Sequence, residues 1–423
     1  MKKRFNLSLI VPVSLSAVFM ASNAMAANWL MLQGTEPEHQ APATKLWGFV
    51  QAEYIKTDDT KLPNGNSAAF NQIAPQLDTA DSFNVKRARI GVRGNNLLLD
   101  SKVNYFLLAE FGNNGLTTGG NASRGQLTDA SVTLNHIPGA RVRVGLFKTP
   151  GSEEGMQAVA VANYINFSNV TDRILNERYF ENSVGNTGRS APAGAFRDTG
   201  VQVFDTFNYG DWSHTYALMY GNGYGVEMSD NDSHKDVYAY LSTEKHFSKN
   251  RGGRSDSMKF YVWHQNGKRT LNDVGTVDRK RTGLGATYFD GTFRLGAEYV
   301  TADGMIYGGT SGAGVPDDGA TFSVLPDEKA KGYYLDLGYR VIPSLELNVR
   351  YDMLDSATET ASLHREFQTT TLGMQYFVNK KTTLRLNYEL RDIDAPDLPS
   401  TAPVHKVLES IDDRISAQVS VHF

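Results

Sequence analysis

Residues 82–94 separate charge from hydrocarbon when they are read as an extended strand, because successive side chains of a strand point to opposite faces. Arg87, Arg89 and Arg93 then fall on one face, and the opposite face carries apolar residues such as Ile90. A strand with one basic and one apolar face suits a wall between water and lipid. The apolar-out, polar-in pattern recurs along most of the chain, which favours a membrane barrel.

The same period of two marks sixteen candidate strands. Most are close to the ~9–11 residues that a tilted strand needs to cross a bilayer. We therefore predict an all-β chain. The predicted strands are residues 46–55, 83–93, 102–111, 127–135, 141–147, 199–207, 212–220, 236–247, 258–267, 279–289, 293–301, 332–341, 345–353, 367–377, 383–391 and 415–423.

The links between these strands alternate in length. Short links such as residues 136–139 are followed by long polar links such as residues 149–197 and 302–331. Short periplasmic turns and long extracellular loops are typical of a membrane barrel. Such a sheet must close, because a bilayer core offers no water to unpaired strand edges. The sequence predicts a transmembrane antiparallel β-barrel of about sixteen strands in residues 45–423, with a lumen too wide for side chains to fill.

The two ends of the chain predict its location. Residues 1–26 combine a basic start, an apolar run and a small-x-small processing site, which indicates a signal peptide. Residues 27–44 show no sustained alternation, and we interpret them as a periplasmic lead-in. Phe423 ends the last strand in a pattern similar to the C-terminal signal of outer-membrane barrels. We expect the protein in the outer membrane of a Gram-negative bacterium, in contact with its lipid and lipopolysaccharide.

Composition argues against several other functions. Acidic residues number 46 against 42 basic ones, which gives a net charge of −4. The charged residues of the predicted signal peptide are all basic, so its removal makes the protein more acidic. This balance argues against a nucleic-acid partner. The absence of Cys excludes thiol catalysis, disulfides and zinc–thiolate sites. The nine His are scattered, and no Ser and His pattern marks a hydrolase, so we expect no metal site, no cofactor and no enzyme activity.

The lumen-facing side of the predicted strands is basic although the whole protein is acidic. A low-dielectric wall focuses the field of such charges into the lumen, which favours small anions over cations. The alternative is that these side chains are polar fillers paired across strands, each pair contributing about 0.2–1 kcal/mol. The predicted pore-lining and anion-binding residues are Arg87, Arg89, Arg93, Arg141, Arg143, Lys148, Arg279, Arg281, Arg294, Arg350 and Arg385.

The longest link, residues 149–197, is too long for an ordinary hairpin, so we expect it to be functional or disordered. Its middle, residues 157–167, is apolar and small, which predicts a loop folded into the barrel that narrows the channel. Its acids outnumber its basic residues, so it would face the arginine wall with opposite charge and weaken selectivity. The alternative is an external loop at a subunit contact. The residues singled out are Glu153, Glu154, Asp172, Arg173, Glu177 and Arg178.

Two motifs carry a family resemblance. VKRARIGVRG, residues 85–94, and VRVGLFKTPGSEEG, residues 142–155, resemble the phosphate-selective porin O and P family of outer-membrane channels. The Gly-x-Phe-Lys-x-Pro element at residues 145–150 is the more specific of the two. The resemblance implies a homotrimer, and it maps Arg87, Arg89 and Lys148 onto the family's basic constriction. Phosphate, dicarboxylates, other oxyanions and unspecific small solutes remain open as substrates.

Our main hypothesis is an outer-membrane porin for passive diffusion of small hydrophilic solutes, with a bias toward anions. The second hypothesis is a barrel scaffold or an outer-membrane enzyme that holds a periplasmic partner. An interior plugged by side chains or by the lead-in peptide would favour the second.

Overall fold

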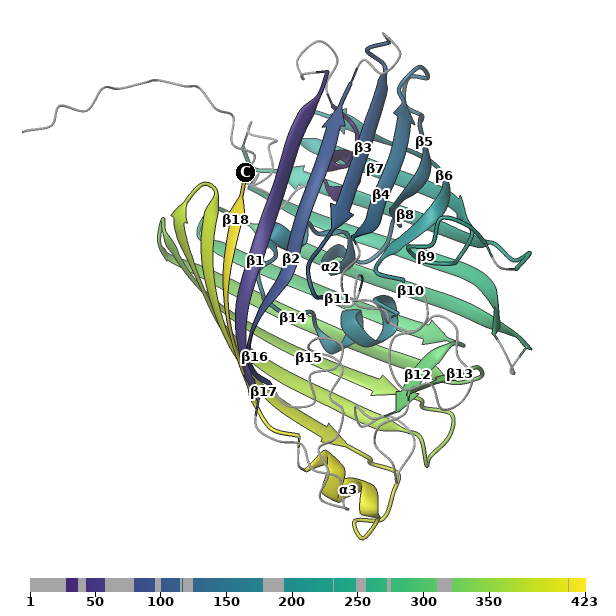
Figure 1. The fold of residues 1–423 in the computed structure, drawn as a ribbon, viewed down its shortest axis with the longest axis vertical. Coiled ribbons are helices and arrows are strands. Elements are labelled where there is room, and N and C mark those ends of the chain that lie inside the picture. Colours follow the sequence, from purple (N-terminus) through teal and green to yellow (C-terminus); the bar gives the residue numbers. More distant parts are fainter. Residues whose placement is uncertain are drawn as a thin grey trace, which may run out of the picture.

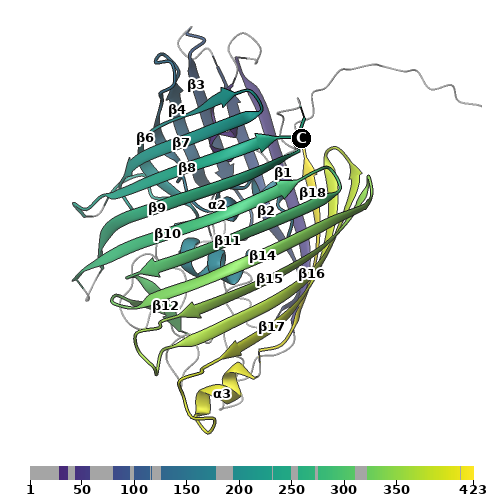
Figure 2. The same cartoon turned by 180° about the vertical axis from the view of Figure 1, so that it is seen from behind.

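The computed structural model describes residues 28–36, 43–57, 80–95, 100–114, 116, 125–177, 194–230, 232–248, 256–271, 275–309, 322–409 and 411–423. Sixteen of the strands in these residues form one closed barrel, seen from opposite sides in Figures 1 and 2. The barrel strands are β1 (Lys45–Thr57), β2 (Ala80–Gly94), β3 (Val103–Glu110), β4 (Gln126–Leu134), β5 (Arg141–Lys148), β6 (Arg197–Tyr209), β7 (Trp212–Gly221), β8 (Asp236–His246), β9 (Ser257–Leu271), β10 (Gly275–Phe289), β11 (Phe293–Asp303), β14 (Lys329–Ile342), β15 (Leu345–Ser356), β16 (Arg365–Asn379), β17 (Thr382–Asp394) and β18 (Arg414–His422).

Every barrel strand pairs antiparallel with its neighbours, and β1 closes the ring against β18. The last residue takes part in this seam, because the Phe423 amide donates to the Gly48 carbonyl at 3.0 Å. All sixteen predicted strands are confirmed. The predicted signal peptide lies outside the described residues, so its cleavage stays a prediction.

The two faces of the wall are inverted relative to a water-soluble protein. In β15, Leu347 on the outer face is 47% exposed, whereas Arg350 on the inner face is 2% exposed. Aromatic pairs flank the apolar outer band, such as Phe293 with Tyr339, whose ring centroids lie 5.0 Å apart. An apolar outer band with aromatic residues at its edges is what a barrel presents to lipid. Within the described residues, no helix is both long and apolar enough to cross a bilayer.

The turns at one end of the barrel are short, such as residues 210–211 and 380–381, and the C-terminus lies at that end (Figure 1). The long links leave from the other end, where α3 (Pro403–Leu408) and a hairpin of β12 (Ile306–Gly309) and β13 (Phe322–Leu325) lie. The hairpin falls in a link that the sequence analysis interpreted as loop. These elements are too short to show a periodicity of their own.

Two segments lie inside the barrel. Residues 149–177, which we call the loop segment, contain α2 (Glu153–Met156), a 3-10 turn (Val159–Val161) and a π-helical turn (Thr171–Leu175). Residues 28–36, which we call the N-terminal segment, contain α1 (Trp29–Leu32). The lead-in predicted for residues 27–44 therefore differs from the structure in its described part, because Trp29 and Leu30 pack into a core within the lumen.

Candidate channel lining

The loop segment leaves β5 and reaches inner-face residues on distant strands. The Ser152 hydroxyl donates to Glu298 of β11 at 2.9 Å, and the Tyr164 hydroxyl donates to Asp336 of β14 at 2.7 Å. Burial and the Asp336 charge raise the pKa of Tyr164 well above its ordinary value, so this hydroxyl stays a donor. Further contacts extend the path to β15, β17, β18 and β1. The described part of the loop segment therefore crosses the lumen.

An apolar core fixes one side of the loop segment. Met156, Val170 and Ile174 are buried in one cluster with Tyr261 and Trp263 from the inner face of β9. Aromatic side chains inside a wide barrel fill space that water would otherwise occupy. Residues outside the predicted apolar stretch 157–167 therefore contribute much of this anchor.

Wall cations pair with three of the four acids in the described part of the loop segment. Glu153 accepts from Lys259 at 2.6 Å, and Glu154 accepts from Arg350 at 2.9 Å. Glu177 accepts from Arg279, and from Arg281 at 3.3 Å. The predicted transverse field is reduced, because these carboxylates are paired. Of the remaining loop residues, Asp172 accepts from the Asn176 amide at 3.2 Å, the Arg173 guanidinium lies 3.7 Å from the Phe367 ring centroid, and Arg178 lies outside the described residues.

Most of the predicted pore-lining arginines are held by carboxylates. Arg89 pairs with Glu110 at 2.6 Å, and Arg294 pairs with Glu346 at 3.1 Å. Cross-strand pairing was the alternative interpretation of the basic wall, and the structure shows it for these residues. The other carboxylate pairs among them are Arg93 with Glu36, Arg141 with Asp205, Arg279 with Asp236, Arg294 with Asp336 and Arg350 with Asp352.

Two predicted arginines rest on uncharged partners. Arg143 donates to the carbonyls of Leu30 and Gln33 in the N-terminal segment. Arg385 donates to the Gln418 side chain at 3.0 Å and to the backbone carbonyl of Ala160, also at 3.0 Å. Their charge is therefore solvated by oxygen dipoles, which leaves more of its field uncompensated than in an ion pair.

Lys148 holds the loop segment in shape. Its Nζ donates to the carbonyls of Gly155, Met156 and Gln157 at 2.8, 3.1 and 2.8 Å. These carbonyls lie at the C-terminal end of α2, where a cation satisfies acceptors that the helix leaves unpaired. Lys148 lies at the base of the loop, as predicted, and all three of its donors are directed to the backbone.

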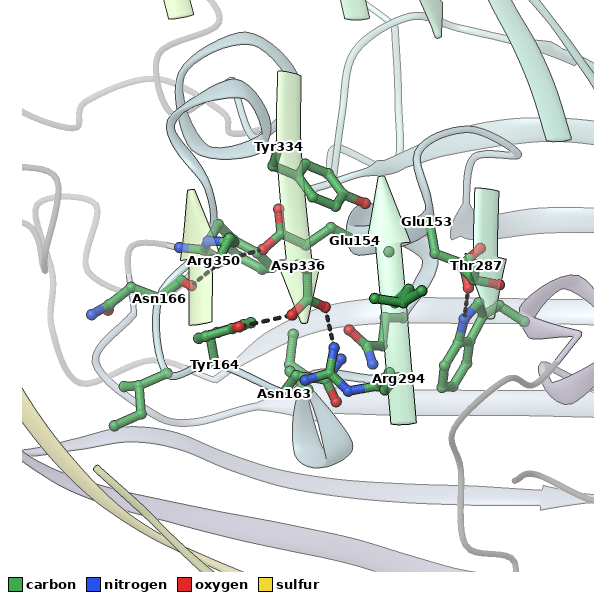
Figure 3. A pocket seen from close by; sticks show the side chains of 18 of the residues that line it. Glu153, Glu154, Asn163, Tyr164, Asn166, Thr287, Arg294, Tyr334, Asp336 and Arg350 are labelled. Carbon is green, nitrogen blue, oxygen red and sulfur yellow. Dashed lines mark hydrogen bonds and ion pairs between the residues drawn. The ribbon is translucent and has the colours of Figure 1, made fainter. Parts of the chain in front are cut away.

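A cavity of mixed charge lies beside the loop segment (Figure 3). Glu153 and Glu154 line it on the loop side, and Arg294, Asp336 and Arg350 line it on the wall side. Figure 3 shows the Tyr164 hydroxyl directed at Asp336, which is itself paired with Arg294. The charges of this cavity compensate one another.

A second cavity is basic. Lys86 and Arg414 face it in addition to the predicted Arg87 and Arg89, together with Lys148 and Arg197. Asp172 is the one acidic residue among the described residues that line it. The carboxylates that pair with these cations, such as Glu53 with Lys86 at 3.2 Å, are not part of its lining. The cationic residues thus line the cavity, and the carboxylates that pair with them lie outside its lining.

The two cavities meet at a partition. Arg87, Val159, Ile165, Asn166 and Phe167 line both of them. Arg87 comes from the wall, where it donates to Gln51 at 2.9 Å, and the other four come from the loop segment. The boundary between the two cavities therefore lies between β2 and residues 159–167.

Three cations of the basic cavity were missed by the sequence analysis. Opposite Gln51 and Ala52 of β1, strand β2 has a β-bulge that places both Lys86 and Arg87 on the inner face. An alternation of strict period two cannot show such an insertion. Arg197 and Arg414 were assigned to the ends of long links. Arg414 is in phase with Ser416 and the other inward residues of β18, so extending the alternation by one residue would have found it.

Within the part of the chain that the structure describes, no group of three or more His, Asp or Glu side chains is arranged to hold a metal ion. The lining of the two cavities consists largely of charged and polar side chains.

A model of the phosphate-selective porin O and P family matches residues 65–398. The chain belongs to this family. The resemblance of the two motifs is thereby confirmed, and so are the function of an outer-membrane porin and the location in the outer membrane of a Gram-negative bacterium. No curated protein sequence matches the chain.

Solved outer-membrane channels share the barrel fold. The outer membrane channel DcaP of Acinetobacter baumannii is 16% identical, with 92% of this chain and 100% of that chain covered and a TM-score of 0.53. The anion-selective porin from Comamonas acidovorans is 15% identical, with 90% of this chain and 99% of that chain covered and a TM-score of 0.55. Salmonella typhi OmpF is 13% identical, with 90% of this chain and 97% of that chain covered and a TM-score of 0.56. At these identities the likeness shows the fold of the porin.

Proposed function

We propose that this porin passes small hydrophilic solutes with a bias toward anions, and that small oxyanions cross through the basic cavity. The single observation that carries the proposal is the lining of that cavity, to which six residues with cationic side chains and one with a carboxylate contribute among the described residues. Charges on a low-dielectric wall raise the local concentration of counter-ions, and Arg or Lys rings of this kind suit anion and phosphate pores. Permeation needs binding that is weak enough to release the ion.

We place Arg87 at the narrowest point of the path between the two cavities. It lines both cavities opposite residues 159–167, so an anion that moves between them passes its guanidinium. We assign Arg89, Lys86 and Arg414 to the approach on the basic side. Arg294 and Arg350 line the mixed cavity, where paired carboxylates reduce their pull on an anion.

The position of the N-terminal segment was the observation that would favour a scaffold or an enzyme with a periplasmic partner. We rank the scaffold or enzyme second. The N-terminal segment contacts the inner faces of β2 to β7, and both cavities beside the loop segment remain open. The homotrimer and the absence of enzyme activity belong to the same proposal, supported by family membership.

The experiment is a reversal potential in planar bilayers under a salt gradient. We expect anion selectivity for the wild type and a shift toward cations when Arg87 and Arg89 are both replaced by Ala. The shift should shrink at high salt, since the screening length falls from ~10 Å at 0.1 M to ~3 Å at 1 M.

The matched control is Lys329→Ala with Lys331→Ala, which removes two positive charges that are about half exposed at the long-link end of β14. It should move the reversal potential much less. A cation-selective wild type would refute the anion bias, and block of chloride current by added phosphate or dicarboxylate would rank the oxyanions.

A further inference from the structure

The N-terminal segment lies mainly against strands that the loop segment does not contact. Its Asn28 amide donates to Thr206 of β6 and Thr215 of β7, both at 2.8 Å. At its other end, the Glu36 carbonyl accepts from Asn104 of β3 at 3.0 Å. The loop segment contacts β9 to β11, β14 to β18, β1 and β2. Together the two segments cover most of the inner circumference.

The N-terminal segment covers cations of the wall. Arg143 is fully buried, and it donates to Leu30 at 3.2 Å and to the Gln33 carbonyl. Arg93 donates to the Leu32 carbonyl at 2.7 Å and pairs with Glu36. Two residues that the sequence analysis assigned to the pore lining are therefore turned toward this segment.

The fit between segment and wall is specific. Gly34 has a φ of +63°, a conformation that favours glycine, and a Cβ at this position would lie 3.3 Å from the Cβ of Phe106. Trp29 is 7% exposed, and its indole N–H donates to Glu153 of the loop segment at 2.8 Å. A peptide that entered the lumen without a specific fit would not need a left-handed glycine where its backbone passes Phe106 of the wall. The contact between Trp29 and Glu153 also joins the two inner segments.

We propose that residues 28–36 are a selectivity-determining lining of this channel, which masks the basic wall of β2 and β5 and narrows the periplasmic half of the lumen. The proposal deepens the proposed function and rests on it. Once the predicted signal peptide is removed, the segment has one covalent attachment, through residues 37–44 to β1. Its polar contacts to the wall are chiefly neutral hydrogen bonds and carbonyls that accept from arginine, so it can be removed without breaking the barrel.

The test replaces residues 28–36 by a Gly/Ser sequence of equal length behind the intact signal peptide. Removal of Glu36 and of the ordered carbonyls leaves Arg93 and Arg143 facing the lumen. We expect a larger single-channel conductance and a reversal potential shifted further toward anions, with the shift reduced in 1 M salt. Heat-modifiable migration on a gel confirms that the variant has folded.

Seating of the segment is measured separately, with a charged thiol reagent in a chain that has no other Cys. Leu30 is 4% exposed and Leu32 is 38% exposed, so Leu32→Cys should react and Leu30→Cys should not. Trp29→Ala should raise the reactivity of Leu30→Cys and the conductance in parallel, whereas Leu32→Ala should change neither. This series stands even where the Gly/Ser variant fails to assemble.

Three outcomes overturn the proposal: equal reactivity at both cysteines, unchanged conductance in the Gly/Ser variant, or a larger conductance with unchanged selectivity, which would reduce the segment to a steric plug. A wild-type channel that is cation-selective or does not conduct would instead refute the proposed function. The two failures are therefore distinguishable.

Discussion

The two inner segments are held to the same barrel in different ways. The loop segment is continuous with β5 at one end and carries four carboxylates, of which Glu153, Glu154 and Glu177 are each paired with a buried wall cation. In the N-terminal segment, Glu36 is the one carboxylate among the described residues, and its partner Arg93 is only partly buried. Carbonyls and the amide of Asn28 make its other polar anchors.

This difference implies that the loop segment is held to the wall more firmly than the N-terminal segment. Removing one partner of a buried ion pair costs about 3–5 kcal/mol, because the remaining charge is left in a poorly solvated site. A hydrogen bond to a charged group contributes about 1.5–3 kcal/mol, and a neutral one about 0.5–1.5 kcal/mol. The loop segment should therefore stay in place whenever the barrel is folded, whereas the N-terminal segment should loosen under smaller changes. Three substitutions test this contrast.

The largest effect is expected for Arg350→Ala. Arg350 donates to Glu154 at 2.9 Å and to the carbonyl of Asn166 at 3.2 Å, and it faces Asp352 at 3.3 Å. Its loss leaves the buried carboxylate of Asp352 and the partly buried carboxylate of Glu154 without this cation, so we expect a loss of about 3–5 kcal/mol in the free energy of unfolding. The measurement is the urea midpoint in detergent, followed by heat-modifiable migration.

The control for this change is Lys331→Ala, which removes a cation 58% exposed and 3.7 Å from Asp355. Exposed pairs contribute about 0.2–1 kcal/mol, so its midpoint should stay close to that of the wild type. Equal midpoints for Arg350→Ala and Lys331→Ala would contradict the idea that charge anchors the loop segment.

A smaller and more local effect is expected for Arg143→Ala. It removes the donor to Leu30 and Gln33, worth about 1.5–3 kcal/mol for a charged hydrogen bond. The N-terminal segment should loosen while the barrel stays folded, which a higher labelling rate at Leu30→Cys would report. Arg385→Ala is the matched control, because Arg385 is also buried among uncharged oxygens but donates to Ala160 of the loop segment. If both variants label equally fast, the two segments are not held independently.

The barrel itself could be predicted from sequence, because a strand that faces lipid on one side and water on the other repeats every two residues. Leu347 and Arg350 illustrate this, with 47% and 2% exposure on opposite faces of β15. The alternation of short and long links added the topology. Neither signal requires knowledge of which side chains meet across the lumen.

The charge pattern of the lining could not be predicted in the same way. Arg294 pairs with Asp336, which follows it only after the whole β12–β13 link, and the register between β11 and β14 decides that contact. Lys86 reaches the inner face through a bulge, which hydrophobic alternation does not record. The N-terminal segment is short, so its position depends on tertiary contacts such as those of Trp29 and Gly34 rather than on local pattern.

The smallest effect is expected for Gly34→Ala, which tests the closest approach of the N-terminal segment to the wall. A left-handed conformation costs an L-residue roughly 1–2 kcal/mol, and here the new Cβ also meets Phe106 at 3.3 Å. Gly210→Ala is the matched control, because Gly210 has a φ of +56° in the turn between β6 and β7 and a Cβ there meets nothing within 4 Å. Both variants carry the backbone strain, but only Gly34→Ala should raise the labelling rate at Leu30→Cys and the conductance. A response of similar size in Gly210→Ala would show that general strain, rather than the seating of residues 28–36, controls access to the basic wall.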